Sequence, residues 1–286
     1  MANLKGGSYE KQIKDAFHRL EAFGKGRHGK NDHMTHSDGI ASKREMYLKD
    51  YKTFVEERGF AEKLNRTMTN ENIQTFLNHR LDGLKTSTQE NYIRGFSSML
   101  EGLKEANITI SVDKEVFNSK VAEIKENRVN TIETNRAISN PSTVISNLYD
   151  KRYESGVIAQ IQNELGVRVS ESFEIVKNLD NYYNPSNGTI ENLIGKGNHT
   201  YEAKVISSEL IEKIKACDAV PSQNSYRNDL KSVGVDHSHD WRYTYAKSEF
   251  EAKIESGIEY NQALREVSKE LNHSRGSMTL FYLSKG

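Results

Sequence analysis

The stretch HDWRYTYA, residues 239–246, decides the fold and the chemistry that the rest of the chain has to fit. Further on come LNH, residues 271–273, and Tyr282, nine residues after the second histidine. An arginine forms two parallel hydrogen bonds with phosphate oxygens, and a tyrosine hydroxyl attacks an electrophile when a base or a cation activates it. His239, Arg242, His273 and Tyr282 together therefore predict a site that binds a phosphodiester and attacks it.

Two upstream residues would complete such a site. Arg168 comes two residues after Gly166, which ends a predicted helix. Lys196 lies in the sequence GKGN, residues 195–198, which predicts a hairpin turn because glycine and asparagine adopt left-handed conformations. The turn joins two predicted strands, and helices return after them. The expected elements here are strands over 188–194 and 201–206 and helices over 208–217, 240–255 and 260–271.

The first part of the chain has a helical period and no convincing strand. Helices are expected over 8–23, 42–58 and 70–82, and a further one is expected to start at a capping box formed by Ser87 and Glu90. Residues 1–125 therefore predict a small helical domain. The polar segment 126–138 is expected to be a linker, and a second domain is expected over 139–286. Its first helix should start at Asn140 and Pro141, an N-cap followed by a first-turn proline.

Composition limits the class of protein. No run of eighteen apolar residues predicts a membrane span, and the N-terminus lacks the apolar core of a signal peptide. The single cysteine excludes an internal disulfide, so we expect a cytoplasmic protein. The 40 basic residues are balanced by 40 acidic residues, which counts mildly against nucleic-acid binding. However, Lys25, Arg27 and Lys30 cluster in a glycine-rich loop, which is either a solvated linker or a contact with a DNA backbone.

Four motifs in one order carry a family resemblance. ELGVRVSE (residues 164–171) and IGKGN (194–198) resemble the first arginine box and the lysine hairpin turn of the tyrosine recombinases, the phage-integrase type. HDWRYTYA and LNH with Tyr282 resemble the second and third boxes. The resemblance covers residues 139–286, and the helical first part looks like the family's SAM-like core-binding domain by architecture. The implied fold is mainly α, with a small β-hairpin or sheet in the catalytic domain.

The resemblance also implies roles for the residues. Arg168 and Arg242 would clamp the phosphate, and Tyr282 would be the nucleophile. His239 and His273 would accept the phenolic proton or bind the phosphate, and Lys196 would protonate the leaving 5′ oxygen. Glu171 would support the first arginine box. The product would be a covalent 3′-phosphotyrosine that is religated without ATP, and we expect no metal and no other cofactor because the arginines supply the positive charge.

The sequence departs from the family pattern in three places. Asn272 stands where the family usually has glycine, and asparagine also tolerates a left-handed conformation. HTYE, residues 199–202, is less basic than the family's segment after the lysine, which predicts a weaker grip on phosphate. Only Leu283 to Gly286 follow the tyrosine, so we expect protomers to assemble through other contacts.

Each residue also has a structural alternative to its predicted role. The alternatives are a surface residue for Arg168 and Glu171, a solvated turn for Lys196, a helix cap for His239, a packed helix end for His273 and a core tyrosine for Tyr282. Trp241 and Tyr245 are expected in the core. We predict a site-specific recombinase or integrase that acts on double-stranded DNA sites as a homo-oligomer, a tetramer on DNA. The alternatives are a type IB topoisomerase-like enzyme and a non-catalytic DNA-binding protein of the same fold.

Overall fold

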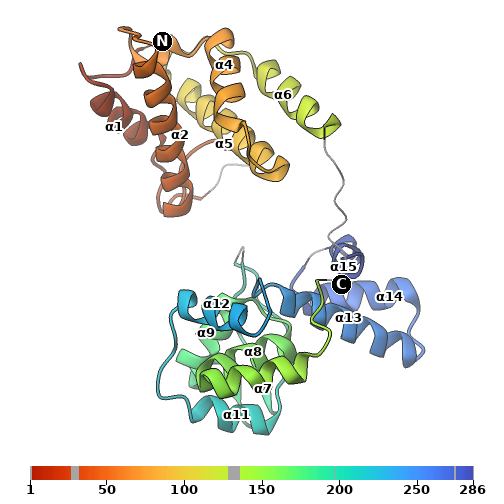
Figure 1. Ribbon diagram of the computed structural model, residues 1–286. Helices are drawn as coiled ribbons and strands as arrows, with labels where there is room; N and C mark the ends of the chain where they lie inside the picture. The colour runs from red at the N-terminus through yellow and green to blue at the C-terminus, as the bar shows by residue number, and fades with distance from the viewer. Residues whose placement is uncertain (1, 27–31, 128–135, 197, 274, 286) are drawn as a thin grey trace. The chain divides into compact units, whose positions relative to one another are not determined.

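The computed structural model describes residues 2–26, 32–127, 136–196, 198–273 and 275–285. The chain divides into two compact units, residues 1–130 and residues 131–286 (Figure 1). Most of each unit is helical, and a small antiparallel sheet lies in the second unit, so the predicted fold class is confirmed. None of the described helices combines the length and the apolar composition needed to cross a membrane.

The first unit is a bundle of helices around an aromatic core. Its core includes Tyr51, Phe76 and Phe96, whose rings lie 5.2 to 6.1 Å apart between centroids. Side chains recurring every three to four residues on each helix bury one face against this core. The helices are α1 (Tyr9–Leu20), α2 (Asp38–Glu57), α3 (Leu64–Thr67), α4 (Asn70–Leu81), α5 (Thr86–Glu105) and α6 (Lys114–Glu126).

The predicted capping box at the start of α5 is wrong. α5 begins at Thr86 with Lys85 as its N-cap, so Ser87 and Glu90 lie inside the helix. The side chain of Gln89 instead holds the turn before α5, because its Nε2 donates to the carbonyl oxygens of Leu81 at 3.0 Å and Leu84 at 2.8 Å. A local motif predicted a helix correctly but misplaced its first residue.

The second unit has helices on either side of its small sheet in chain order. Pro141 is the first residue of α7 and Asn140 is its N-cap, as predicted. The helices before the sheet are α7 (Pro141–Lys151), α8 (Tyr153–Leu165), α9 (Val169–Lys177) and α10 (Leu179–Tyr182). Those after it are α11 (Ser208–Lys215), α12 (Gln223–Ser232), α13 (Asp240–Glu255), α14 (Tyr260–Glu270) and α15 (Ser277–Leu283). α13, α14 and α15 pack together at one end of the unit (Figure 1).

The sheet is shorter than the sequence predicts. It consists of β1 (Tyr183–Asn184), β2 (Thr189–Ile190) and β3 (Lys204–Val205) in the order β1-β2-β3, and both pairs are antiparallel. Ile190 pairs with Lys204, and farther along only an isolated bridge joins Ile194 to Thr200. Asn192 has φ 56°, a left-handed conformation that interrupts an extended strand. The two predicted strands therefore pair only at Thr189 and Ile190 with Lys204 and Val205. The residues between them form a long turn that the bridge from Ile194 to Thr200 closes.

The end of α8 fixes the start of the candidate site. Gly166 has φ 63°, and a Cβ atom built on it would lie 2.4 Å from the ring of Tyr245. Glycine is therefore required here both for the left-handed conformation and for the close approach of α13. Trp241 and Tyr245 are buried on α13, as predicted, so this contact holds α8 and α13 together.

Gly166→Ala is expected to destabilise the second unit by roughly 2 to 4 kcal/mol, since it adds an unfavourable left-handed alanine to a clash in a packed core. Urea unfolding measures this, and the fluorescence of Trp241 reports on the second unit because it is the chain's single tryptophan and is buried there. Gly188→Ala is the matched control. Gly188 has φ 67° but nothing lies within 4 Å of its Cβ position, so its cost should be about 1 kcal/mol. Equal costs at the two positions would refute the packing argument.

Candidate active site

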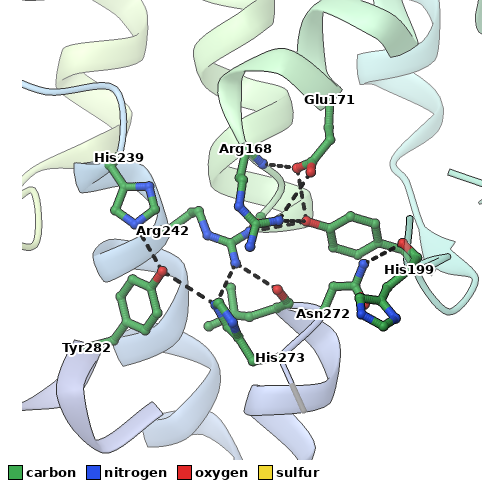
Figure 2. A network of polar contacts seen from close by, with 11 residues as sticks. Arg168, Glu171, His199, His239, Arg242, Asn272, His273 and Tyr282 are labelled. Carbon is green, nitrogen blue, oxygen red and sulfur yellow. Dashed lines mark hydrogen bonds and ion pairs between the residues drawn. The ribbon is translucent and has the colours of Figure 1, made fainter. Parts of the chain in front are cut away.

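Arg168 lies where α8 has ended and α9 begins. It is the N-cap residue of α9, and Glu171 lies in the first turn of that helix. The Glu171 carboxylate accepts a hydrogen bond from the backbone N–H of Arg168 and a second one, 3.2 Å long, from its Nη1 (Figure 2). One carboxylate therefore fixes both the backbone and the guanidinium of Arg168. Neither Nε nor Nη2 of this arginine has a hydrogen bond within the described part of the chain.

Arg242 lies in the first turn of α13 and is completely buried. Its Nη1 donates to the carbonyl oxygen of Gly166 and, at 3.3 Å, to the hydroxyl of Tyr201. Its Nη2 donates to the carbonyl oxygen of Leu271 at 2.7 Å and to Nε2 of His273 at 3.0 Å. Its Nε is also buried, yet has no partner among the described residues. Because buried donors are nearly always paired, this N–H is the one that a ligand would complete.

The hydroxyl of Tyr282 lies between two imidazoles (Figure 2). It is 2.9 Å from Nε2 of His239 and 3.5 Å from Nε2 of His273. A guanidinium has no acceptor, so Nε2 of His273 accepts the bond from Arg242 and the ring proton of His273 sits on Nδ1. α15 carries Tyr282, whose ring is buried against the ring of Tyr243 at 4.7 Å between centroids.

The surroundings keep both histidines neutral. Burial, together with the positive charges of Arg242, Arg136 and Arg168, lowers the pKa of His239 to about 4. Burial and the charges of Arg242 and Arg168 likewise lower the pKa of His273 to about 4. A neutral imidazole presents one lone pair, and because that of His273 accepts the bond from Arg242, His239 is the ring placed to accept the phenolic proton.

These pKa shifts predict a loss of stability in acid. The ordinary histidine value is 6.5, so between pH 6.5 and pH 4 the unfolded chain binds protons that the folded chain excludes. The stability is therefore fully present above pH 6.5 and is lost as the pH falls toward 4. Lowering the pH from 7 to 5 should cost roughly 1 kcal/mol per histidine, after allowance for solvent screening. Urea unfolding followed at Trp241 measures it.

Variants identify the source of that loss. His239→Gln and His273→Gln should each flatten the pH dependence between pH 7 and 5. His237→Gln is the matched control, because His237 is exposed two residues away from His239 and should leave the dependence unchanged. A wild-type stability that does not change over this range would contradict the assigned neutral state.

Lys196 lies on the turn between β2 and β3, with its side chain exposed. The backbone N–H of Gly195 and Nδ2 of Asn272 both donate to the carbonyl oxygen of His199, each at 2.8 Å. A Cβ atom on Gly195 would lie 3.2 Å from Oε1 of Glu171, so the turn lies directly against the arginine cluster. The side chain of Lys196 itself has no hydrogen bond or ion pair with the rest of the described chain.

Asn272 keeps the conformation that the family's glycine would have. Its φ is 56°, in the left-handed region, and it directly follows the C-cap of α14. Its side chain adds a bond that glycine cannot make, because Nδ2 connects α14 to the turn that carries Lys196. Asparagine in place of glycine therefore still allows the backbone turn that precedes His273. It also links the end of α14 to the turn that carries Lys196.

The structure brings most of the predicted site residues into one network and leaves others apart. Those in the network are Arg168, Glu171, His239, Arg242, His273 and Tyr282 (Figure 2), with the turn of Lys196 beside them. Lys25 lies exposed in the first unit, where its carbonyl oxygen accepts a bond from His36. Arg27 and Lys30 lie outside the described residues.

Two residues of the cluster were not predicted from the sequence. Tyr201, 5% exposed, bonds both arginines and Glu171. Lys204 is also buried, and burial lowers its pKa to about 8. Its Nζ lies 3.4 Å from the hydroxyl of Tyr245. Strand alternation could not have identified both residues as buried, because they are three positions apart and alternation buries every second residue.

Sequence comparison and structure comparison give different results for this chain. No profile of a protein family and no curated protein sequence matches it. The XerH site-specific recombinase, bound to a palindromic difH substrate in a post-cleavage complex, matches with a TM-score of 0.57 and 16% identity over 96% of this chain and 79% of that one. Its pre-cleavage complex matches with a TM-score of 0.58 and 15% identity, over 85% and 76%.

A second protein matches over a similar length. The Tn1549 transposon integrase, in complex with transposon right-end DNA, has a TM-score of 0.56 and 14% identity, and the match covers 96% of this chain and 93% of that one. These proteins are tyrosine recombinases. The chain therefore has the fold of the tyrosine recombinases, and the resemblance found in its motifs is matched by its structure.

Proposed function

We propose that this chain is a tyrosine site-specific recombinase, which cuts and rejoins double-stranded DNA through a covalent 3′-phosphotyrosine. The observation that carries the proposal is the Tyr282 hydroxyl, which lies within hydrogen-bonding distance of two neutral imidazoles and beside the buried Arg242. The guanidinium carbon of Arg242 is 5.9 Å from the centroid of the tyrosine ring. α15 thus contributes the nucleophile, Tyr282. The start of α13 contributes the base, His239, and the phosphate-binding cation, Arg242.

The phosphate would be held mainly by Arg168. This arginine keeps Nε and Nη2 for a ligand, while Arg242 spends both of its terminal nitrogens on the protein and keeps only Nε. Two cations and four N–H groups, on three nitrogens, stabilise a phosphorane-like transition state by neutralising its additional charge. Arg242 would therefore act chiefly as a fixed charge, and Arg168 as the hydrogen-bonding fork.

The proposed reaction moves two protons and exchanges one P–O bond for another. The Tyr282 oxygen attacks the phosphorus, the phenolic proton passes to Nε2 of His239, and the P–O5′ bond breaks. Lys196 donates a proton to the leaving 5′ oxygen, since it lies exposed on a turn beside the arginine cluster and keeps its side chain free of partners within the described chain. The new phosphotyrosine ester conserves the energy of the broken bond, so a 5′ hydroxyl can reverse the step without ATP.

The solved structures with this fold support DNA as the partner. XerH is bound to difH substrates and the Tn1549 integrase to transposon right-end DNA. We propose that residues 1–125 form the core-binding domain, that residues 126–138 link the domains, that residues 139–286 form the catalytic domain and that Lys25, Arg27 and Lys30 contact the DNA backbone. Exchange between two duplexes breaks four strands, so a homotetramer on DNA is proposed. We expect it to act in the cytoplasm.

The test starts by finding a DNA site. The Tyr282→Phe protein, which should bind without cutting, selects duplexes from a random-sequence pool. The wild-type protein is then mixed with a selected duplex that carries a nick near its centre, so that the cut strand dissociates and religation is blocked. A protein–DNA adduct that survives detergent is the expected result, and exchange of strands between two intact duplexes follows.

The outcomes separate the three candidate functions. An adduct together with strand exchange supports the recombinase. An adduct and relaxation of supercoiled DNA, without exchange between two sites, would instead indicate a type IB topoisomerase-like enzyme. Binding without any adduct would leave a non-catalytic DNA-binding protein and refute the proposed reaction.

A further inference from the structure

The hydroxyl of Tyr201 lies at the junction of three charged side chains. It accepts hydrogen bonds from Nη1 of Arg168 at 3.1 Å and from Nη1 of Arg242 at 3.3 Å. It donates its own proton to Oε2 of Glu171 at 2.9 Å. Figure 2 shows Arg168 and Glu171, both from the start of α9, close to Arg242 from α13. One oxygen atom therefore connects the two guanidiniums on which the proposed phosphate site depends.

The hydrogen-bonding capacity of a phenol matches this junction completely. A tyrosine hydroxyl has one donor and two acceptor positions, and all three are used here. Burial raises the pKa of Tyr201 to about 12, so the hydroxyl keeps the proton that it donates to Glu171. The side chain is only 5% exposed, so water has little access to replace these bonds if the hydroxyl is removed.

The rest of the chain holds the Tyr201 ring in place. The backbone N–H of Tyr201 donates to the carbonyl oxygen of Leu193 at 2.8 Å. A Cβ atom on Gly195 would lie 2.8 Å from the ring, so a glycine lets the turn pack directly on it. The ammonium group of Lys204 is 6.0 Å from the ring centroid. The ring is therefore fixed between the turn that carries Lys196 and the strand β3.

The two arginines repel one another, and something must hold them at short range. Both guanidiniums bond the same Tyr201 oxygen, so their like charges lie close together. This closeness costs energy in a buried site unless oxygen atoms between the charges compensate. Glu171 supplies the negative charge to Arg168, but within the described part of the chain it makes no bond to Arg242. Tyr201 bonds both arginines and Glu171. Its hydroxyl therefore connects the Glu171 carboxylate to Arg242 through a chain of two hydrogen bonds.

We propose that Tyr201 is a positioning residue, which aligns the guanidiniums of Arg168 and Arg242 so that their remaining N–H groups point at one phosphate. This inference rests on the proposed function and deepens it. It also changes the meaning of the HTYE segment: the tyrosine in it does not weaken the grip on phosphate but organises it. Misplacing a catalytic group by about 1 Å costs on the order of 100-fold in rate.

Tyr201→Phe removes the hydroxyl alone and is the direct test. At saturating protein, the single-turnover rate of adduct formation on the selected duplex should fall about 10- to 100-fold, while the dissociation constant for DNA changes less than about threefold. Tyr245→Phe is the matched control. It removes the hydroxyl of another buried tyrosine that also contacts Lys204 but bonds neither arginine, so its rate should stay within about threefold of the wild type.

A readout that does not depend on catalysis accompanies the rates. The side-chain N–H signals of Arg168 and Arg242, observed by nitrogen-15 NMR in the full chain, should shift in Tyr201→Phe and stay unchanged in Tyr245→Phe. Equal rates in the two variants, or arginine signals that do not move in Tyr201→Phe, would overturn the positioning role. If Tyr201→Phe does not fold, Glu171→Gln changes the same junction and is judged by the same two readouts.

The two proposals fail in different ways. A wild-type protein that forms no adduct refutes the proposed reaction but leaves the NMR comparison decisive for Tyr201. A wild-type protein that forms the adduct, combined with an unaffected Tyr201→Phe variant, refutes the positioning role and leaves the proposed reaction standing.

Discussion

Tyr282→Phe is expected to reduce covalent attachment of the protein to DNA by at least about 10⁴-fold, because it removes the attacking oxygen and no other atom. The ring is buried against Tyr243 and should keep its place, and among the described residues the lost hydroxyl bonds only His239 and His273. The variant should therefore fold, and it should bind the selected duplex with nearly the wild-type dissociation constant. Detergent-resistant adducts on the nicked duplex, separated by electrophoresis, measure the loss.

Tyr243→Phe is the matched control for that experiment. Tyr243 is the neighbouring buried tyrosine on α13, and its hydroxyl accepts a hydrogen bond from Arg136 instead of contacting the imidazoles. Its variant should form adducts at close to the wild-type rate. An adduct that persists in Tyr282→Phe, or one that disappears equally in both variants, would contradict the assignment of the nucleophile.

The second large effect is expected at the arginines. Arg168→Ala should lower the rate of adduct formation by about 10³- to 10⁵-fold, the range seen when an arginine that neutralises a transferring phosphoryl group is lost. Its side chain is about 20% exposed and its neighbours Glu171 and Tyr201 can still bond each other, so the fold should survive. Most of the DNA affinity should survive as well, because many backbone contacts share it.

Arg242 requires a different substitution. Its side chain is completely buried and ties the end of α8 to the end of α14 through two carbonyl oxygens, so alanine would leave both unpaired and would destabilise the unit. Arg242→Lys keeps the charge but loses the planar fork, and it should lower the cleavage rate about 10²- to 10³-fold.

Arg227→Ala separates a general charge effect from a specific one. Arg227 is an exposed arginine of the same unit, and its loss should change neither the rate nor the affinity by more than about threefold. If Arg168→Ala or Arg242→Lys lost DNA binding in parallel with cleavage, these residues would be docking residues and the account of the transition state would fail.

Local signals in the sequence predicted much of the fold. Asn140 and Pro141 identified the start of α7, and Gly166 identified the end of α8, because caps and left-handed glycines depend on neighbouring residues. The capping box at Ser87 was wrong because α5 begins before it, at Thr86, and Gln89 bonds the carbonyl oxygens of the preceding turn, a contact that the motif does not contain. The strands are shorter than predicted because Asn192 adopts a left-handed conformation, which the alternation of apolar and polar residues does not reveal.

The candidate site was predictable in its residue types but not in its connections. His239, Arg242 and Tyr282 were predicted from motifs, and they do lie together. The bonding of Tyr201 to both arginines depends on contacts between residues 33 and 41 positions apart, which no local pattern encodes. The bonds from Arg242 to the backbone carbonyl oxygens of Gly166 and Leu271 could not be predicted from the sequence either. These contacts change the expected chemistry, since they leave only one of its five N–H groups for a phosphate.

The measurement that tests the central claim most directly is mass spectrometry of the trapped adduct. The detergent-resistant complex is digested with protease and nuclease, and the modified peptide is sequenced. We expect a nucleotide joined through its 3′ phosphate to the hydroxyl of Tyr282. An adduct on another residue, a 5′-linked nucleotide, or no modified peptide from a protein that binds the duplex would contradict the account.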